Sequence, residues 1–302
     1  MMMTSVIRFL ICSVLLVGAA CAPAVTPGTA PADSRPDLQQ TLEELVVGFR
    51  GEVGIHVLHL ASGEEAAVAA DDTFPTASVI KVPLLAVLFE RIEAGDLSLD
   101  DEMTWHDSLA YPGRDITAQL REGETISLER LAFLMTSWSD NTASLWIQAL
   151  VGGGQAVNRW LATNGFATTR VNSRTPGREA DWEVYGWGQT TPREMSRLMT
   201  MIREQRAVSH EASERMYRLL SAPFYSAEAL SVLPPTVQVA VKPGAVRRSR
   251  SETLVVEPPG GPYVLTVVTK NQEDDSYDHD NEGWALIRAV SLAVWEHFVT
   301  SP

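Results

Sequence analysis

Ser78 and Lys81 are the first residues in the chain whose types and spacing could do chemistry. They stand three residues apart, at the start of an apolar segment that continues through Leu84, Leu85 and Leu88, so a helix would place both on one face. Burial beside a hydroxyl lowers the pKa of a lysine, which can then take the proton of the serine. A capping serine followed by a surface lysine has the same spacing.

A second polar segment, Ser139-Asp140-Asn141, follows a stretch with helical spacing of apolar residues. Ser139 could relay protons, and Asn141 could donate its amide to an amide of a substrate. Asp and Asn are also common helix caps, so an ordinary helix start would explain the same residues.

A third segment, Lys242-Pro243-Gly244, follows a strand pattern over 237–241. Lys242 would lie on the face opposite the valines of that strand and could project into a cleft. Pro-Gly is equally typical of a turn that ends the strand. The chain has 24 basic residues, of which only Lys81, Lys242 and Lys270 are lysines; the others are arginines, which cannot act as a base near neutral pH.

In this order, S-x-x-K, S-D-N and K-x-G resemble the motifs of the penicillin-recognising serine enzymes, and of the class A β-lactamases in particular. The intervals between them, roughly sixty and one hundred residues, fit the same family. The resemblance covers about residues 40–300. The flanking segments that share it are 76–81, 123–128, 134–135, 139–143 and 190–192.

The resemblance implies a role for each residue at the reacting bond. Ser78 would be the nucleophile and Lys81 the group that activates it. Ser139 would take part in proton transfer to the leaving nitrogen. The backbone N–H groups of Ser78 and Ala245 would form the oxyanion hole.

The same resemblance implies groups that bind the substrate. Asn141 would hold the side-chain amide of the substrate, and Lys242, in one motif with Gly244, would supply positive charge near its carboxylate. No metal or other cofactor is implied.

The third motif departs from the family, which usually has a hydroxyl residue where this chain has Pro243. The hydroxyl contact to the substrate carboxylate is therefore missing. Arg247, Arg248 and Arg250 follow closely, and an arginine can bind a carboxylate through two hydrogen bonds. We expect Arg250 to take this role.

A second departure concerns the water that would release the product. The E-x-x-L-N motif of the class A enzymes, whose glutamate activates that water, is absent, and Thr175 stands near the matching position. Glu179, Asp181 and Glu183 lie in the loop that follows. Glu183 or Glu179 could be a replacement base, Glu183 being preferred because Trp182 is next to it, or all three could be surface carboxylates.

The elements that must position these residues follow from hydrophobic spacing and turn signals. We expect an opening helix near 38–50, a hairpin over 53–70, mostly helix over 78–221, and a helix that starts at a Thr191-Pro192 cap. A strand at 237–241, a hairpin over 253–269 and a closing helix complete the order. The fold class is a two-lobed α/β fold: an antiparallel sheet of about five strands flanked by the terminal helices, plus an all-helical lobe.

The N-terminal residues are typical of an exported protein. Arg8 precedes an apolar run from Phe9 to Ala20, which predicts a signal peptide over 1–20 with Cys21 as a lipidated first residue. Residues 21–37, rich in Pro and Ala, would be a tether. The hydrolase-like domain would span 38–300, its sheet lobe 38–77 and 222–300, and its helical lobe 78–221.

The composition sets limits on the partners. A chain of 302 residues with 45% hydrophobic residues can bury a substantial core, and its net charge of −14 argues against nucleic acid as a partner. We expect a periplasmic or lipid-anchored monomer that acts on a small molecule.

We therefore predict a serine hydrolase that acts on β-lactams through an acyl-enzyme. Two alternatives remain open. One is a D,D-peptidase or other serine hydrolase that acts on peptidoglycan-like peptides, and the other is a penicillin-binding cell-wall sensor that is acylated without hydrolysis.

Overall fold

A five-stranded antiparallel sheet forms one lobe of the computed structural model, which describes residues 37–113 and 115–299. The spatial order of the strands is β2-β1-β10-β9-β8. Their bounds are β1 Glu52–His59, β2 Glu65–Val68, β8 Val239–Val246, β9 Ser249–Val256 and β10 Tyr263–Lys270.

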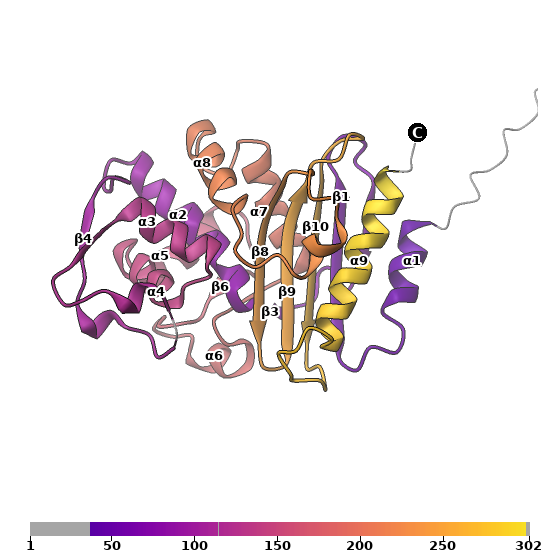
Figure 1. Ribbon diagram of the computed structural model, residues 1–302, viewed down its shortest axis with the longest axis horizontal. Helices are drawn as coiled ribbons and strands as arrows, with labels where there is room; N and C mark the ends of the chain where they lie inside the picture. The colour runs from indigo at the N-terminus through magenta and orange to yellow at the C-terminus, as the bar shows by residue number, and fades with distance from the viewer. Residues whose placement is uncertain (1–36, 114, 300–302) are drawn as a thin grey trace, which may run out of the picture. The chain divides into compact units, whose positions relative to one another are not determined.

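Helices cover both faces of this sheet. Helix α1 (Leu38–Leu45) and helix α9 (Glu282–Val299) pack side by side on one face, as Figure 1 shows. Helix α7 (Pro192–Arg203) packs on the other face against β1, β9 and β10. Alternating residues of the strands therefore enter two separate apolar clusters, one on each side of the sheet.

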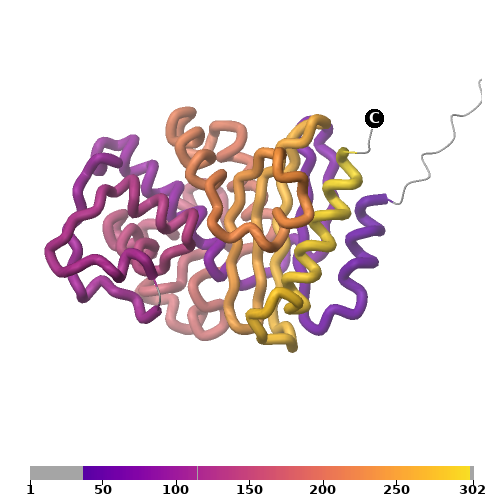
Figure 2. Tube along the Cα trace, viewed as in Figure 1, coloured from indigo at the N-terminus to yellow at the C-terminus, as the bar shows by residue number. Residues whose placement is uncertain are grey.

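The second lobe is helical and is built around α2 (Lys81–Glu93), which is buried from Lys81 to Phe89. A helix that is buried on every side needs neighbours all round, and other helices of this lobe contact it on several sides. Much of the purple and magenta tube in Figure 2 belongs to this lobe. The other helices are α3 Leu128–Ser137, α4 Asn141–Leu150, α5 Gly153–Thr163, α6 Glu179–Tyr185 and α8 His210–Leu220. Two small sheets contain β3 Phe74–Pro75, β4 Glu102–Thr104, β5 Thr125–Ser127, β6 Arg170–Val171 and β7 Gly188–Thr190.

The expected two-lobed fold, with its antiparallel sheet and flanking terminal helices, is confirmed. Helix α7 starts at Pro192 as predicted, with the Thr191 hydroxyl accepting from the backbone N–H of Glu194. The opening helix is shorter than predicted: it ends at Leu45, before a turn at Gly48 with φ of +84°.

The strand predicted to end at Val241 instead continues to Val246, through Pro243 and Gly244. Strand β8 lies at one edge of the sheet and pairs only with β9. The missing N–H of Pro243 therefore leaves no carbonyl of a second neighbouring strand without its hydrogen bond.

The predicted signal peptide, Cys21 and residues 22–36 of the tether lie outside the described residues. Within residues 37–113 and 115–299, no helix combines the length and the apolar character needed to cross a membrane.

Candidate active site

Ser78 lies in a short 3₁₀ turn, Ala77–Ile80, immediately before α2. The turn packs against β7, β8 and β9, at the junction of the two lobes. Ala77 has φ of +45°, in the left-handed region that residues other than glycine rarely adopt. Such a conformation persists only where the surrounding packing holds it. Ser78 lines a cavity of about 520 Å³.

Lys81 is the closest group that could activate this serine. Its Nζ atom lies 3.2 Å from Ser78 Oγ, 3.1 Å from Ser139 Oγ and 2.8 Å from Asn141 Oδ1, and it also contacts the carbonyl oxygen of Ser139. Burial lowers the pKa of Lys81 to about 7, although Asp115 and Asp140 partly oppose the shift. A substantial fraction of the amine is therefore neutral near pH 7, as a general base requires.

Ser139 connects this lysine to a second one. Its Oγ atom lies 2.9 Å from Nζ of Lys242, which is fully buried on β8 and also donates to the carbonyl of Pro243. Burial, and then the nearby Lys81, hold the pKa of Lys242 well below its usual value. The repulsion between two adjacent ammonium groups favours the neutral form of Lys242.

The loop that carries Ser139 is anchored by two carboxylates. Asp140 caps α4 by accepting from the N–H of Ala143 at 2.8 Å, and its other oxygen accepts from the N–H of Thr117 at 2.9 Å. Ser139 itself has φ of +58°. The helix-cap alternative is therefore correct for Asp140, while Ser139 and Asn141 face the cavity.

Asp115 is the second anchor, and it lies outside the motifs that predict the site. It accepts from the backbone N–H groups of Asn141 and Thr142 at 3.2 and 2.8 Å, and from the Thr142 hydroxyl at 2.7 Å. No local motif marks Asp115, because its partners lie more than twenty residues further along the chain.

Gly244 allows β8 to pass directly beside Ser78. A Cβ atom at Gly244 would lie 2.8 Å from the backbone nitrogen of Ser78 and 2.6 Å from Ser251 Oγ. Ser251 in turn donates to the carbonyl of Thr76 at 2.9 Å, which ties β9 to the residues before the nucleophile. Ala245 also lines the cavity, so both expected oxyanion-hole residues border the same space.

Arg250 does not line this cavity, contrary to our expectation. It is fully buried, and its guanidinium donates to the carbonyls of Val246, Ser249 and Ser276. The guanidinium carbon lies 4.8 Å from the Tyr277 ring centroid and 5.4 Å from that of Trp284. Arg250 therefore supports the aromatic wall of the cavity from behind, because its side chain leaves β9 on the side that faces α9.

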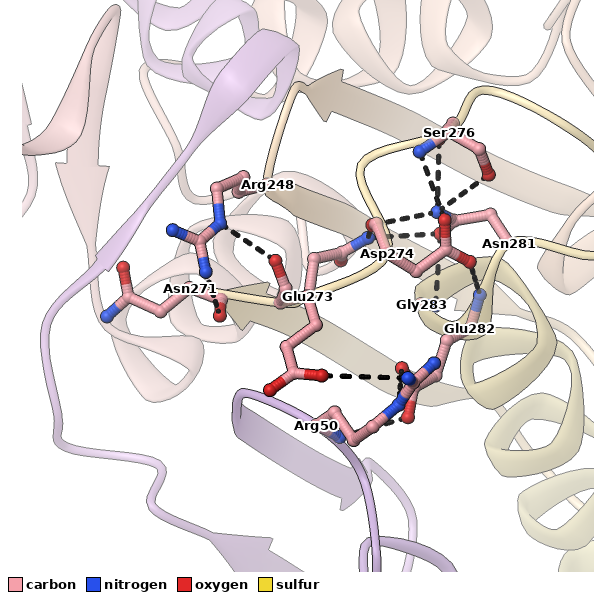
Figure 3. A network of polar contacts seen from close by, with 10 residues as sticks. Arg50, Arg248, Asn271, Glu273, Asp274, Ser276, Asn281, Glu282 and Gly283 are labelled. Carbon is pink, nitrogen blue, oxygen red and sulfur yellow. Dashed lines mark hydrogen bonds and ion pairs between the residues drawn. The ribbon is translucent and has the colours of Figure 1, made fainter.

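The loop between β10 and α9 completes this wall and carries Tyr277. Asn281 is buried and donates to the carbonyls of Asp274 and Ser276 at 3.1 and 3.0 Å, while Asp274 accepts from the N–H of Glu282 (Figure 3). Hydrogen bonds to the Asp274 carboxylate, first from the N–H of Glu282 and then from the hydroxyl and N–H of Ser276, lower its pKa to about 2. The other two arginines of the cluster, Arg247 and Arg248, also face away from the cavity: one pairs with Asp275 and the other donates to backbone carbonyls.

Glu179 and Glu183 do not line the cavity of Ser78. They lie on α6, a seven-residue helix where we expected a loop, and both are exposed and line a second cavity of about 570 Å³. Trp182 therefore does not bury Glu183. Thr175, at the position of the missing glutamate, lines the same second cavity and donates to the carbonyl of Ser173.

Carboxylates do border the cavity of Ser78, but each is held by other groups. Asp115 and Asp140 accept the bonds described above, and Glu228 pairs with Arg288 at 2.7 Å. Trp138, Tyr225, Tyr277 and Trp284 provide most of the remaining wall. Among the described lining residues there is no arginine or lysine, so Lys81 and Lys242 reach the cavity only through Ser78 and Ser139.

Comparisons with known proteins identify relatives over nearly all the described residues. The model of the beta-lactamase enzyme family matches residues 37–298. The beta-lactamase VEB-1 of Pseudomonas aeruginosa is 20% identical over 274 residues, which cover 87% of this chain and 91% of that protein. A beta-lactamase from Sphaerobacter thermophilus superposes with a TM-score of 0.77 at 24% identity, covering 88% of this chain and 98% of the other.

A further solved structure, PBP-A, has a TM-score of 0.77 at 26% identity and covers 86% of this chain and 95% of its own. A mutant of PBP-A has been solved as an acyl-enzyme complex with penicillin G, and it covers the same share of this chain with a TM-score of 0.76 at 25% identity. Since the family model extends over nearly all the described residues, the chain belongs to the beta-lactamase enzyme family.

Proposed function

We propose that the protein opens the ring of β-lactams by forming an acyl-enzyme on Ser78. The observation that carries this proposal is the continuous contact from Ser78 through Lys81 and Ser139 to Lys242, with every link between 2.9 and 3.2 Å. Membership of the beta-lactamase family and the penicillin adduct of the PBP-A mutant support it.

Acylation follows from the hydrogen bonds around Lys81. A neutral amine has two N–H donors, enough for Asn141 Oδ1 and the carbonyl of Ser139, and a lone pair that can take the hydroxyl proton of Ser78. Ser78 Oγ then attacks the lactam carbonyl, and the backbone N–H groups of Ser78 and Ala245 stabilise the oxyanion.

Ring opening requires a proton on the leaving nitrogen. Ser139 Oγ can donate its own proton and recover one from Lys242 or Lys81, since both amines lie within 3.1 Å. The Asn141 Oδ1 atom is engaged by Lys81, which leaves the Nδ2 amide to donate to the acyl side chain of the substrate.

Deacylation is expected to be the slow step. Asp115, Asp140 and Glu228, the carboxylates that border the cavity, already accept hydrogen bonds or pair with an arginine. The base for the attacking water is then Lys81, which can act only after it has passed on the proton that it took from Ser78. We therefore expect deacylation to be slower than acylation, so that the acyl-enzyme accumulates.

This slow step favours a second candidate, a D,D-peptidase or a non-hydrolytic penicillin-binding sensor, because a long-lived acyl-enzyme can transfer to another acceptor or act as a signal. Two assays distinguish a β-lactamase, a D,D-peptidase and a sensor. One measures steady-state hydrolysis of a chromogenic cephalosporin, and the other measures release of D-alanine from a D-alanyl-D-alanine peptide. We expect cephalosporin turnover that Ser78→Ala abolishes. D-Alanine release without cephalosporin turnover would favour the peptidase, and a stable adduct with neither activity would favour the sensor.

We also propose that the protein is exported and anchored through lipidated Cys21, on the support of the apolar run from Phe9 to Ala20 that precedes it. Cell fractionation tests this. The wild-type chain should appear with the membranes and Cys21→Ser in the soluble exported fraction, whereas equal distribution of both would refute the anchor.

A further inference from the structure

The second cavity has the chemistry of a site for a positively charged group. We propose that it binds an ammonium group at the end of the acyl side arm of the substrate that reacts with Ser78, an inference that rests on the proposed function. The cavity, of about 570 Å³, is separate from the one that Ser78 lines, and its lining includes none of the four hydrogen-bonded residues Ser78, Lys81, Ser139 and Lys242.

Three aromatic rings form its apolar walls. The ring centroids of Tyr111 and Trp187 are 5.2 Å apart with an interplanar angle of 61°, and those of Trp182 and Trp187 are 6.2 Å apart at 57°. All three residues line the cavity, and the inclined rings therefore present faces and edges from different directions. An ammonium ion is attracted to the negative face of such rings, tryptophan most strongly.

The charged groups at the cavity point to the same ligand. Glu179 and Glu183 are four residues apart on α6 and so lie on one face of that helix. The carboxylate of Glu179 accepts from the N–H of Gly177 at 3.1 Å, while the carboxylate of Glu183 has no hydrogen-bond or ion-pair partner within the described part of the chain. Arg174 is the one cation among the described lining residues, so these residues carry a net negative charge.

The two cavities lie close together along helix α4. Asn141 lines the cavity of Ser78, and Leu145, one turn further along the helix, lines the second cavity. One loop is also tied to this helix beside both cavities: the N–H of Tyr111 donates to the hydroxyl of Thr142 on α4 at 3.0 Å, and that hydroxyl donates to Asp115 of the same loop at 2.7 Å. Tyr111 lines the second cavity and Asp115 the first.

A substrate arm would follow this path. In the proposed function, Asn141 holds the amide that begins the acyl side arm, so the atoms beyond that amide extend along α4 toward Leu145. An arm that ends in a carboxylate would meet the carboxylates of Glu179 and Glu183 and be repelled, whereas an alkylammonium would be attracted to them and to the rings.

Two penicillins that differ only at the end of a flexible acyl arm test this proposal. One ends in trimethylammonium and the other in the neutral tert-butyl group of the same shape. The rate constant for acylation of the full chain, followed by intact mass, should be about tenfold larger for the ammonium compound. Trp182→Leu and, separately, Glu183→Gln should bring the ratio of the two rate constants toward one.

Matched variants control for the loss of a ring or a charge elsewhere. Phe133→Leu on α3 and Glu211→Gln on α8 alter exposed side chains outside the lining of the second cavity, and should keep the wild-type ratio. A wild-type ratio of one would overturn the proposal. An unchanged ratio in both Trp182→Leu and Glu183→Gln would overturn it too.

Failure of the proposed function is distinguishable from failure of this inference. If neither penicillin acylates the protein, the proposed function is wrong, and tetramethylammonium chloride then tests the ammonium site directly. A saturable change in tryptophan fluorescence that is lost in Trp182→Leu would support the site, and no saturable change would overturn it.

Discussion

At the scale of single residues, the chemistry depends on two lysines that the fold has removed from water. Lys81 and Lys242 share Ser139 as a partner, and burial lowers the pKa of both. An arginine at either position would stay charged, because its guanidinium does not lose a proton in this pH range.

We therefore expect Lys81→Arg to lower the acylation rate by about 10²–10⁴-fold, the usual contribution of a general base. In the wild type, the base is the deprotonated amine, so the rate should rise as the pH increases through about 7, the pKa of Lys81. Stopped-flow acylation across pH 5.5–9 measures both effects.

Lys270→Arg is the matched control, since Lys270 lies on β10 and pairs with Glu52. It should keep the wild-type rate and pH profile. A pH-independent rate in the wild type, or equal losses in both variants, would show that Lys81 is not the base.

Glu252 is a buried carboxyl whose protonation affects stability. Burial raises its pKa to about 8, which is above the value of about 4.3 for an unfolded chain. The folded state then holds a proton that the unfolded state has lost, so this group makes the free energy of unfolding fall as the pH rises between these values.

Glu252→Gln should remove that decline while keeping an oxygen acceptor for the N–H of Ala229. We expect it to raise the free energy of unfolding at pH 8 by an amount on the order of 1–3 kcal/mol, and by less at pH 5. Urea denaturation at both pH values measures the difference in the free energy of unfolding between the variant and the wild type. An equal increase at pH 5 and pH 8 would contradict the raised pKa of Glu252.

At the scale of elements, the edge strand β8 brings the third motif to the nucleophile. Gly244→Ala would place a methyl group 2.8 Å from the backbone of Ser78, and backbone cannot move aside as a flexible side chain can. We expect a loss of about 1–3 kcal/mol of stability and a much larger fractional loss of acylation.

Gly113→Ala provides the control, because a Cβ there has no neighbour within 4 Å. Denaturation midpoints and acylation rates of both variants separate a general effect from the local one. Normal acylation by a stable Gly244→Ala variant would show that acylation does not require β8 to lie so close to Ser78.

Arg250 belongs to the same scale, because it joins β9 to the loop that carries Tyr277. Arg250→Ala should slow acylation by a free-acid lactam and by its methyl ester to the same extent, since the guanidinium supports the wall and does not face the substrate. Parallel acylation rates for the two compounds test this. A selective loss for the acid would restore the carboxylate-binding role that the sequence suggested.

At the scale of the whole molecule, hydrophobic spacing and turn signals could predict the antiparallel sheet with its terminal helices, whereas the function of the three motifs is predicted from their resemblance to a family. The hairpin of β9 and β10 follows from the turn residues at 258–261, and α7 from its Thr191-Pro192 start. The spacing of apolar residues could not predict the short helix α6, because none of its residues is buried and no apolar stripe marks it.

Contacts between distant residues account for what the sequence could not predict. The anchoring by Asp115 and the inward course of Arg250 depend on partners brought together by folding. The course of β8 through Pro243 depends on its place at the edge of the sheet, which no local pattern reveals.

In the whole molecule, we expect Ser78 to be the one point of covalent attachment and deacylation to be the slow step. Intact-mass spectrometry during reaction with a chromogenic cephalosporin tests this most directly. We predict a burst of product equal to the enzyme present, a slow steady state, and an adduct that peptide mapping places on Ser78 and that a folded Ser78→Ala variant lacks. Turnover without any adduct, or an adduct that persists in Ser78→Ala, would contradict the account.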